Sequence, residues 1–217
     1  MSLRALGCFF LLLACMLGNT EPASQVPTPS GGTGWESLFD GQTLKGWKVL
    51  KELNFDQAGK VEVQDGCIVL GEGGPYTGIT WEGDFPRENF EVEWEGMRPE
   101  GTDIFCGLTV PVGSDHITFV PGGWSNSLVG LSNVDDMNAS ENMSSKGMSF
   151  ENKRWYKFCV RVTSERIQVS IDGKEVIHQE REGHTFSIYS QLEPNRPVGF
   201  FSWYTTGHLR SLRMRRL

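Results

Sequence analysis

Carboxylate side chains gather in the polar segment 134–150, where Asp135, Asp136 and Glu141 lie close together with two asparagines nearby. Oxygen ligands at such spacing suit a hard divalent cation, so manganese, calcium or magnesium is the expected metal. The segment has no glycine at the turn position that an EF-hand loop requires. The alternative is a solvated acidic loop. Long polar connections in compact domains are often functional, which makes Asp135 a candidate catalytic base as well as a metal ligand.

Two further titratable side chains are candidates for acid–base chemistry. Glu72 stands in a glycine-rich stretch at a predicted strand end, and His116 opens another predicted strand. A surface turn is the alternative for Glu72, and a solvent-facing or hydrogen-bonded imidazole is the alternative for His116. The remaining histidines have no neighbouring carboxylate or cysteine at the spacing of a triad or a zinc site. The catalytic candidates are therefore Glu72, His116 and Asp135.

Aromatic and amide side chains could form a sugar-binding surface, because such surfaces combine flat apolar faces with a few polar groups. The candidates for this role are Trp81, Trp124, Asn126, Trp203 and Tyr204. Core packing is the alternative for each aromatic residue. It is weakest for Trp124, which lies in a Gly-Gly-Trp-Ser-Asn stretch between two predicted strands.

A two-residue alternation of apolar and polar side chains predicts the strands that must position these groups. Phe90, Val92 and Trp94 alternate with glutamates, and Asp65-Gly66 and Asp172-Gly173 are typical of tight hairpin turns. Strands are expected at 61–64, 67–70, 78–81, 90–95, 104–110, 116–120, 128–131, 156–162, 166–171, 175–178, 198–205 and 209–217. No convincing helical period is present. The sequence therefore predicts an all-β fold, a two-sheet antiparallel jelly-roll sandwich.

The start of the chain resembles an export signal. Arg4 precedes an apolar run over 5–17 that is too short to span a bilayer comfortably. We expect an export signal at 1–18, a flexible tether at 19–33 and one domain at 34–217. Leu12-Leu13-Ala14-Cys15 resembles a lipoprotein box, with lipidation of Cys15; ordinary cleavage downstream is the alternative. The protein is expected to be exported, as a periplasmic, lipid-anchored or extracellular protein.

Charge and cysteine content exclude other classes. The formal net charge is -7, which disfavours a nucleic-acid partner. An arginine run near the end is expected to be the solvated side of a last strand. Cys67, Cys106 and Cys159 form no Cys-x-x-Cys motif, which disfavours a zinc site or a thioredoxin-type site. Cys106 alternates with apolar residues and is expected in the core.

The opening of the predicted domain carries a family signature. The stretch 34–47 reads Gly-Trp-Glu-Ser-Leu-Phe-Asp-Gly-Gln-Thr-Leu-Lys-Gly-Trp and closely resembles that of the 3-keto-disaccharide hydrolase family, also described as 3-keto-glucoside 1,2-lyase/3-keto-2-hydroxy-glucal hydratase-like. Asp84-Phe85, Asn89-Phe90-Glu91 and the arginine-rich final strand are also similar to it. The resemblance covers 34–217. It implies a concanavalin A-like jelly roll related to laminin-G domains, and cleavage of 3-keto-glycosides, often with a divalent metal.

The central strands depart from the pattern of catalytic members, which often carry a Ser-Gly-Ile-x-x-Arg type stretch. Here 104–108 reads Ile-Phe-Cys-Gly-Leu, and 122–132 resembles a planctomycete-type branch. Two functions are therefore expected as alternatives. One is hydrolase or lyase cleavage of a 3-keto-glycoside by proton abstraction next to the keto group. The other is a non-catalytic carbohydrate-binding or cell-envelope module on the same fold.

Overall fold

The computed structural model describes residues 34–217. The expected export signal at 1–18, the tether at 19–33 and the lipidation candidate Cys15 lie outside the described residues. Within 34–217, no helix combines the length and the apolar character that crossing a bilayer requires.

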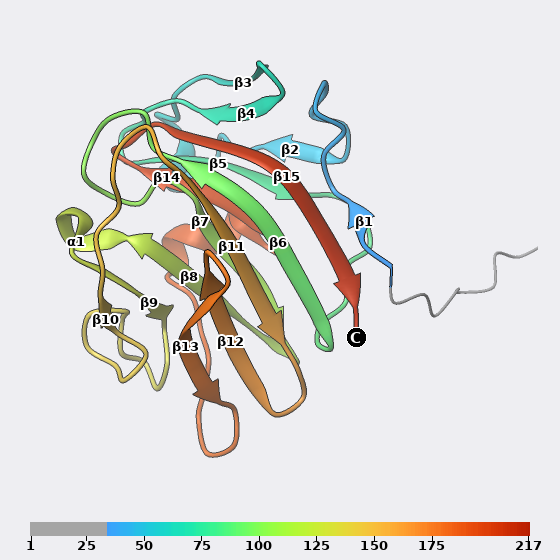
Figure 1. Ribbon diagram of the computed structural model, residues 1–217, viewed down its shortest axis with the longest axis vertical. Helices are drawn as coiled ribbons and strands as arrows, with labels where there is room; N and C mark the ends of the chain where they lie inside the picture. The colour runs from blue at the N-terminus through green and yellow to red at the C-terminus, as the bar shows by residue number, and fades with distance from the viewer. Residues whose placement is uncertain (1–33) are drawn as a thin grey trace, which may run out of the picture. The chain divides into compact units, whose positions relative to one another are not determined.

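Residues 34–217 form two antiparallel sheets that pack face to face, which confirms the all-β sandwich (Figure 1). The first sheet contains β1 (Glu36–Ser37), β3 (Val61–Gln64), β4 (Cys67–Leu70), β6 (Phe90–Met97), β11 (Trp155–Val162), β12 (Arg166–Ile171), β13 (Lys174–Glu180) and β15 (Gly207–Arg216). Its strand order is β13-β12-β11-β6-β15-β4-β3, with β1 paired to β15.

The second sheet contains β2 (Trp47–Val49), β5 (Tyr76–Trp81), β7 (Gly107–Val112), β8 (Asp115–Gly122), β9 (Leu128–Ser132), β10 (Lys146–Gly147) and β14 (Gly199–Trp203). Its order is β10-β9-β8-β7-β14-β5-β2. Both orders place strands that are distant in the sequence side by side, as β15 beside β6 shows in Figure 1. This is the crossing connectivity of a jelly roll rather than a simple meander.

The two predicted Asp-Gly hairpins are confirmed. Gln64 pairs with Cys67, and Ile171 pairs with Lys174, so each loop has two residues. In both loops the aspartate and the glycine have positive φ, at 50° and 75° in the first and 50° and 78° in the second. These angles match a type I′ turn, whose twist follows that of paired strands.

The core lies between the sheets and is rich in aromatic rings. Trp94 is fully buried on β6, stacked on Phe158 with ring centroids 5.1 Å apart, and edge-on to Phe200 at 5.2 Å. Cys106 is also fully buried, as its alternation predicted, and burial raises the pKa of its thiol. A neutral buried thiol is a packing group rather than a nucleophile.

The outer face of the first sheet is a ladder of ion pairs. The glutamates of β6 alternate with the arginines of β15 and with basic residues of β11. The pairs are Glu91–Arg215, Glu91–Arg161, Glu93–Arg213, Glu93–Lys157 and Glu95–Arg210. The arginines are partly exposed, as expected. Glu91, which pairs with Arg215 and Arg161, is itself buried at 6% exposed.

The outer face of the second sheet is partly covered by two short 3-10 helices, η1 (Leu53–Phe55) and η2 (Ser190–Asn195). Phe55 and Leu192 from these helices pack with Tyr76 of β5 and Phe201 of β14 in a second, smaller apolar cluster. Beyond the edge of this cover, aromatic side chains of the same strands border a cavity.

Candidate functional site

An aromatic cavity lies on the outer side of the second sheet, with a volume of about 400 Å³. We call it the aromatic cavity, and its lining residues are Tyr76, Asp103, Ile104, Trp124, Tyr189, Gln191 and Trp203. Tyr76 and Trp203 are cross-strand partners on β5 and β14, with ring centroids 4.5 Å apart and planes at 70°. Their edge-to-face contact sets the orientation of one wall.

Trp124 also lines the cavity, and a strained loop holds it in place. The single turn α1 (Gly123–Asn126) contains three consecutive left-handed residues, with φ of 51° at Trp124, 57° at Ser125 and 65° at Asn126. Such angles cost about 1–3 kcal/mol for each non-glycine residue, and they persist where surrounding contacts enforce them. The result is an indole that remains 43% exposed at the cavity.

Side chains supply the contacts that enforce this loop. The Asn126 amide donates to the carbonyl of Phe150 at 3.0 Å and accepts from the N–H of Phe150 at 2.9 Å. The Ser127 hydroxyl donates to the carbonyl of Trp124 at 2.7 Å, and the N–H of Ser125 donates to Asp103 Oδ2 at 3.2 Å. These bonds give the exposed indole a defined position before any ligand arrives.

Arg98 lies behind the cavity and ties its supports together. Its side chain is 2% exposed, and burial lowers the pKa of its guanidinium. Nη1 donates to the carbonyl of Asp103 at 3.1 Å, Nη2 donates to the carbonyl of Phe150 at 2.8 Å, and Nε donates to Asn152 Oδ1 at 2.6 Å. One buried cation therefore positions both backbone segments on which the Trp124 loop depends.

The structure brings together part of the predicted sugar-binding set. Trp124 and Trp203 both line the aromatic cavity. Tyr204 is 55% exposed and packs edge-on to Trp203 with ring centroids 5.1 Å apart, so it extends the aromatic surface. Asn126 supports the loop through Phe150 rather than lining the cavity. Trp81 packs edge-on to Trp47 at 5.1 Å against the main core, which is the core-packing alternative.

Sequence reasoning missed the other residues of the cavity wall. Tyr76 precedes the strand expected at 78–81, and only the pairing of β5 with β14 reveals that it faces Trp203. Tyr189 directly precedes η2 and Gln191 lies within it. This short helix has no helical periodicity in its sequence from which it could be predicted. Burial raises the pKa values of Tyr76 and Tyr189, so both phenols stay protonated at neutral pH and can donate hydrogen bonds.

The catalytic candidates do not converge on this cavity. Glu72 is exposed in the loop between β4 and β5, where its backbone N–H donates to the Thr206 hydroxyl at 3.2 Å. His116 is 5% exposed on β8, and neither of its ring nitrogens has a hydrogen-bond partner. Burial and the charges of Arg196 and Arg87 lower the pKa of His116 to about 4. The histidine is therefore neutral at pH 7.

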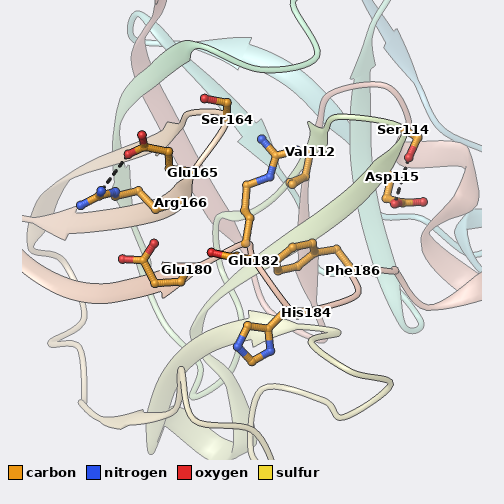
Figure 2. A pocket seen from close by; sticks show the side chains of 11 residues that line it. Val112, Ser114, Asp115, Ser164, Glu165, Arg166, Glu180, Glu182, His184 and Phe186 are labelled. Atoms are coloured by element: carbon orange, nitrogen blue, oxygen red, sulfur yellow. Dashed lines mark hydrogen bonds and ion pairs between the residues drawn. The ribbon is translucent and has the colours of Figure 1, made fainter.

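Asp135 is hydrogen-bonded to His184, which lines a second hollow, a polar cleft of about 710 Å³ (Figure 2). The polar cleft is lined by both acidic and basic side chains, among them Asp115, Glu165, Arg166, Glu180, Arg181 and His184. Asp135 Oδ2 lies 2.6 Å from His184 Nδ1, and the N–H of Thr185 donates to Asp135 Oδ1 at 2.8 Å. These two hydrogen bonds lower the pKa of Asp135, the backbone bond contributing more. Asp135 and His184 are far apart in the sequence, so sequence reasoning did not predict that they pair.

The carboxylates predicted to bind a metal do not share one site. Asp135 is engaged by His184 and Thr185, while Glu141 Oε2 accepts the N–H of Asn138 at 3.1 Å within the same loop. Among residues 34–217, no three side chains of His, Cys, Asp or Glu converge closely enough to hold a metal ion. The residues present do not fit the divalent metal that the resemblance implies, and a metal at Asp135, Asp136 and Glu141 stays a prediction from the sequence.

Solved structures with a similar fold include three from proteins of known or assigned carbohydrate chemistry. A candidate glycosyl hydrolase from Parabacteroides distasonis is 14% identical with a TM-score of 0.53, covering 88% of this chain and 98% of that one. The carbohydrate-binding module CBM66 from Bacillus subtilis is 13% identical with a TM-score of 0.55, covering 78% and 95%. The Crh5 transglycosylase in complex with NAG is 14% identical with a TM-score of 0.57, covering 86% and 85%. At these identities the likeness shows the fold alone.

Comparison with curated proteins found no match. The family model of the 3-keto-alpha-glucoside-1,2-lyase-like domain, in contrast, matches residues 34–215. That range covers all but the last two of the described residues, and it includes the residues that line the aromatic cavity and the polar cleft. The chain therefore belongs to the 3-keto-alpha-glucoside-1,2-lyase-like domain family.

Proposed function

We propose that this protein binds a glycoside in the aromatic cavity. The observation that carries the proposal is the exposed indole of Trp124, which a strained and multiply bonded loop holds in the cavity that Trp203 also lines. A preorganised aromatic pair suits a pyranose ring, whose C–H faces are apolar and whose hydroxyls need a few polar partners. The volume of about 400 Å³ lies in the range of small-ligand sites.

The polar groups of the cavity complete the recognition. The Gln191 amide and the phenols of Tyr76 and Tyr189 can donate to sugar oxygens, and Asp103 has lone pairs left on its carboxylate after accepting two backbone N–H bonds. The fold is shared with the module CBM66 and with a transglycosylase solved with NAG, which supports a carbohydrate as the ligand.

Truncating the exposed indole tests this proposal. The Trp124→Ala variant should bind neutral oligosaccharides at least about tenfold more weakly than the wild type, because an aromatic contact at the centre of a site typically contributes about 2 kcal/mol or more. Isothermal titration calorimetry against a panel of oligosaccharides measures the change. The matched control is Trp155→Ala, a partly exposed tryptophan on β11 in the other sheet. Equal affinity in wild type and Trp124→Ala would remove the cavity as the binding site.

Cleavage of a 3-keto-glycoside is a second candidate, favoured by the family match and by the Asp135–His184 pair at the polar cleft. The ketone at C3 acidifies the C2–H bond. A base takes that proton, the electron pair forms an enolate, and the C1–O bond then breaks as the enone forms. The departing alkoxide takes up a proton, and water later adds across the enone double bond. Because the Asp135 carboxylate is hydrogen-bonded to Nδ1 of His184, Nε2 of the same ring is the atom that would accept the proton as the base.

Replacing this histidine separates the two candidates. With 3-keto-trehalose as substrate, His184→Gln should lower kcat about 100-fold or more, the usual contribution of a general base. The control is His178→Gln, an exposed histidine held by Glu175 and Glu180 on β13. Assays with EDTA and with added manganese test the metal prediction. Unchanged turnover in His184→Gln would exclude the pair, and no turnover by any sample would leave binding as the proposed activity.

A further inference from the structure

The aromatic cavity has an uneven distribution of charge. Its lining contains one carboxylate, on Asp103, and none of its seven lining residues is lysine, arginine or histidine. The Arg98 cation is not among the lining residues: it is buried, and each of its three nitrogens donates to an acceptor of the protein, namely Asp103 O, Phe150 O and Asn152 Oδ1. A ligand in the cavity therefore faces a negative charge without a cationic partner in the lining.

Asp103 is kept in place by the backbone around it. Its Oδ1 accepts the N–H of Ile104 at 2.9 Å, and its Oδ2 accepts the N–H of Ser125 at 3.2 Å. The second of these bonds also supports the Trp124 loop. The negative charge is thus part of the cavity's construction and cannot swing away when a ligand enters.

An anionic sugar would be penalised twice in this environment. Its carboxylate or sulfate would lose hydration on entering an aromatic site without gaining a cationic partner, and it would be repelled by Asp103. The net charge of -7 adds a longer-range repulsion. An uncharged sugar meets neither penalty, because hydroxyl groups can be satisfied by Gln191 and the two phenols.

From this charge pattern we infer that the aromatic cavity selects uncharged sugar residues and rejects uronic acids and sulfated sugars. The inference rests on the proposed glycoside binding and adds the class of glycan. Gln191 is the position that would reverse the selection, because its side chain is exposed at the cavity and a lysine there would add an ammonium group to the lining that contains Asp103.

A set of three ligands on one sugar backbone tests the inference. The neutral oligosaccharide that binds best is oxidised at its primary hydroxyls to the uronate, and part of that product is converted to the methyl ester. The wild type should bind the uronate at least about tenfold more weakly than the parent, and the neutral ester should recover most of the loss. Because charges are screened by salt, the difference should narrow between about 20 mM and about 1 M NaCl.

Variants at Gln191 give a second readout. Gln191→Lys should gain at least about fivefold in affinity for the uronate, while Gln191→Met, of similar size and without charge, should show no such gain. Equal binding of uronate and parent by the wild type, or a best ligand that is itself anionic, would overturn the inference and leave glycan binding intact. A panel in which no glycan binds would instead refute the proposed function.

Discussion

The Arg98→Met variant should lose about 3 kcal/mol of unfolding free energy and most of its affinity for oligosaccharides. The substitution removes the donors of the Asp103 and Phe150 carbonyls and of Asn152 Oδ1. Leaving buried acceptors without partners costs about 1–3 kcal/mol each, less where a second donor such as the Asn126 amide remains. Urea unfolding followed by tryptophan fluorescence measures the stability, and calorimetry measures the binding.

A surface arginine provides the comparison for this variant. Arg154 is half exposed, pairs with Asp172 at 3.0 Å and lies over the Tyr156 ring at 4.4 Å. Because exposed ion pairs contribute little, Arg154→Met should change the unfolding free energy by less than about 1 kcal/mol. If Arg98→Met were as stable as Arg154→Met and still bound glycan normally, Arg98 would have no part in positioning the Trp124 loop.

The buried histidine of β8 should make the protein less stable in mild acid. The pKa of His116 is lowered from 6.5 to about 4 in the folded state, chiefly by burial. Between these two values the unfolded chain binds more protons than the folded one, so stability falls as pH decreases from 6.5 to about 4. Above about pH 6.5 the histidine is neutral in both states and stability is not reduced. Below about pH 4 the shift in pKa lowers the free energy of unfolding by its full amount, about 3 kcal/mol.

A leucine at this position isolates the effect from that of the carboxylates. The ring nitrogens of His116 have no partners to lose, so His116→Leu should be as stable as the wild type at about pH 7 and more stable at about pH 4.5. His178 gives the opposite sign, since its glutamate partners raise its pKa and its contribution is lost as pH rises. Parallel pH dependences of wild type and His116→Leu would show that His116 is not the titrating group.

Local patterns in the sequence determined the building blocks of this protein. Side-chain alternation needs only neighbouring residues to be read, which is why the strands and their buried faces could be predicted. The Asp-Gly hairpins could be predicted for the same reason, because positive φ at two adjacent positions is a local requirement. The family signature at 34–47 is likewise continuous in the sequence, and the family model matches from residue 34.

Only part of the candidate site could be predicted from such local patterns. Trp124 was expected at the surface because it stands in a short glycine-rich link between strands, and it is exposed. Trp81 has the same residue type and was also a candidate for the sugar-binding surface, with core packing as its alternative, and it packs against Trp47. The sequence around Trp81 does not reveal this contact, because it depends on what another part of the chain places against the ring.

Tertiary structure alone decided which side chains meet. Tyr76 faces Trp203 because β14 lies between β5 and β7, and Asp135 meets His184 because two distant loops run side by side. The order of strands in a sheet reflects the burial of the whole core, and many orders are compatible with the same alternating segments. Arg98 shows the same limit, because the residues next to it in the sequence give no sign that it is buried. Its burial depends on the carbonyls of Asp103 and Phe150 and on the amide oxygen of Asn152, which separate parts of the chain bring to it.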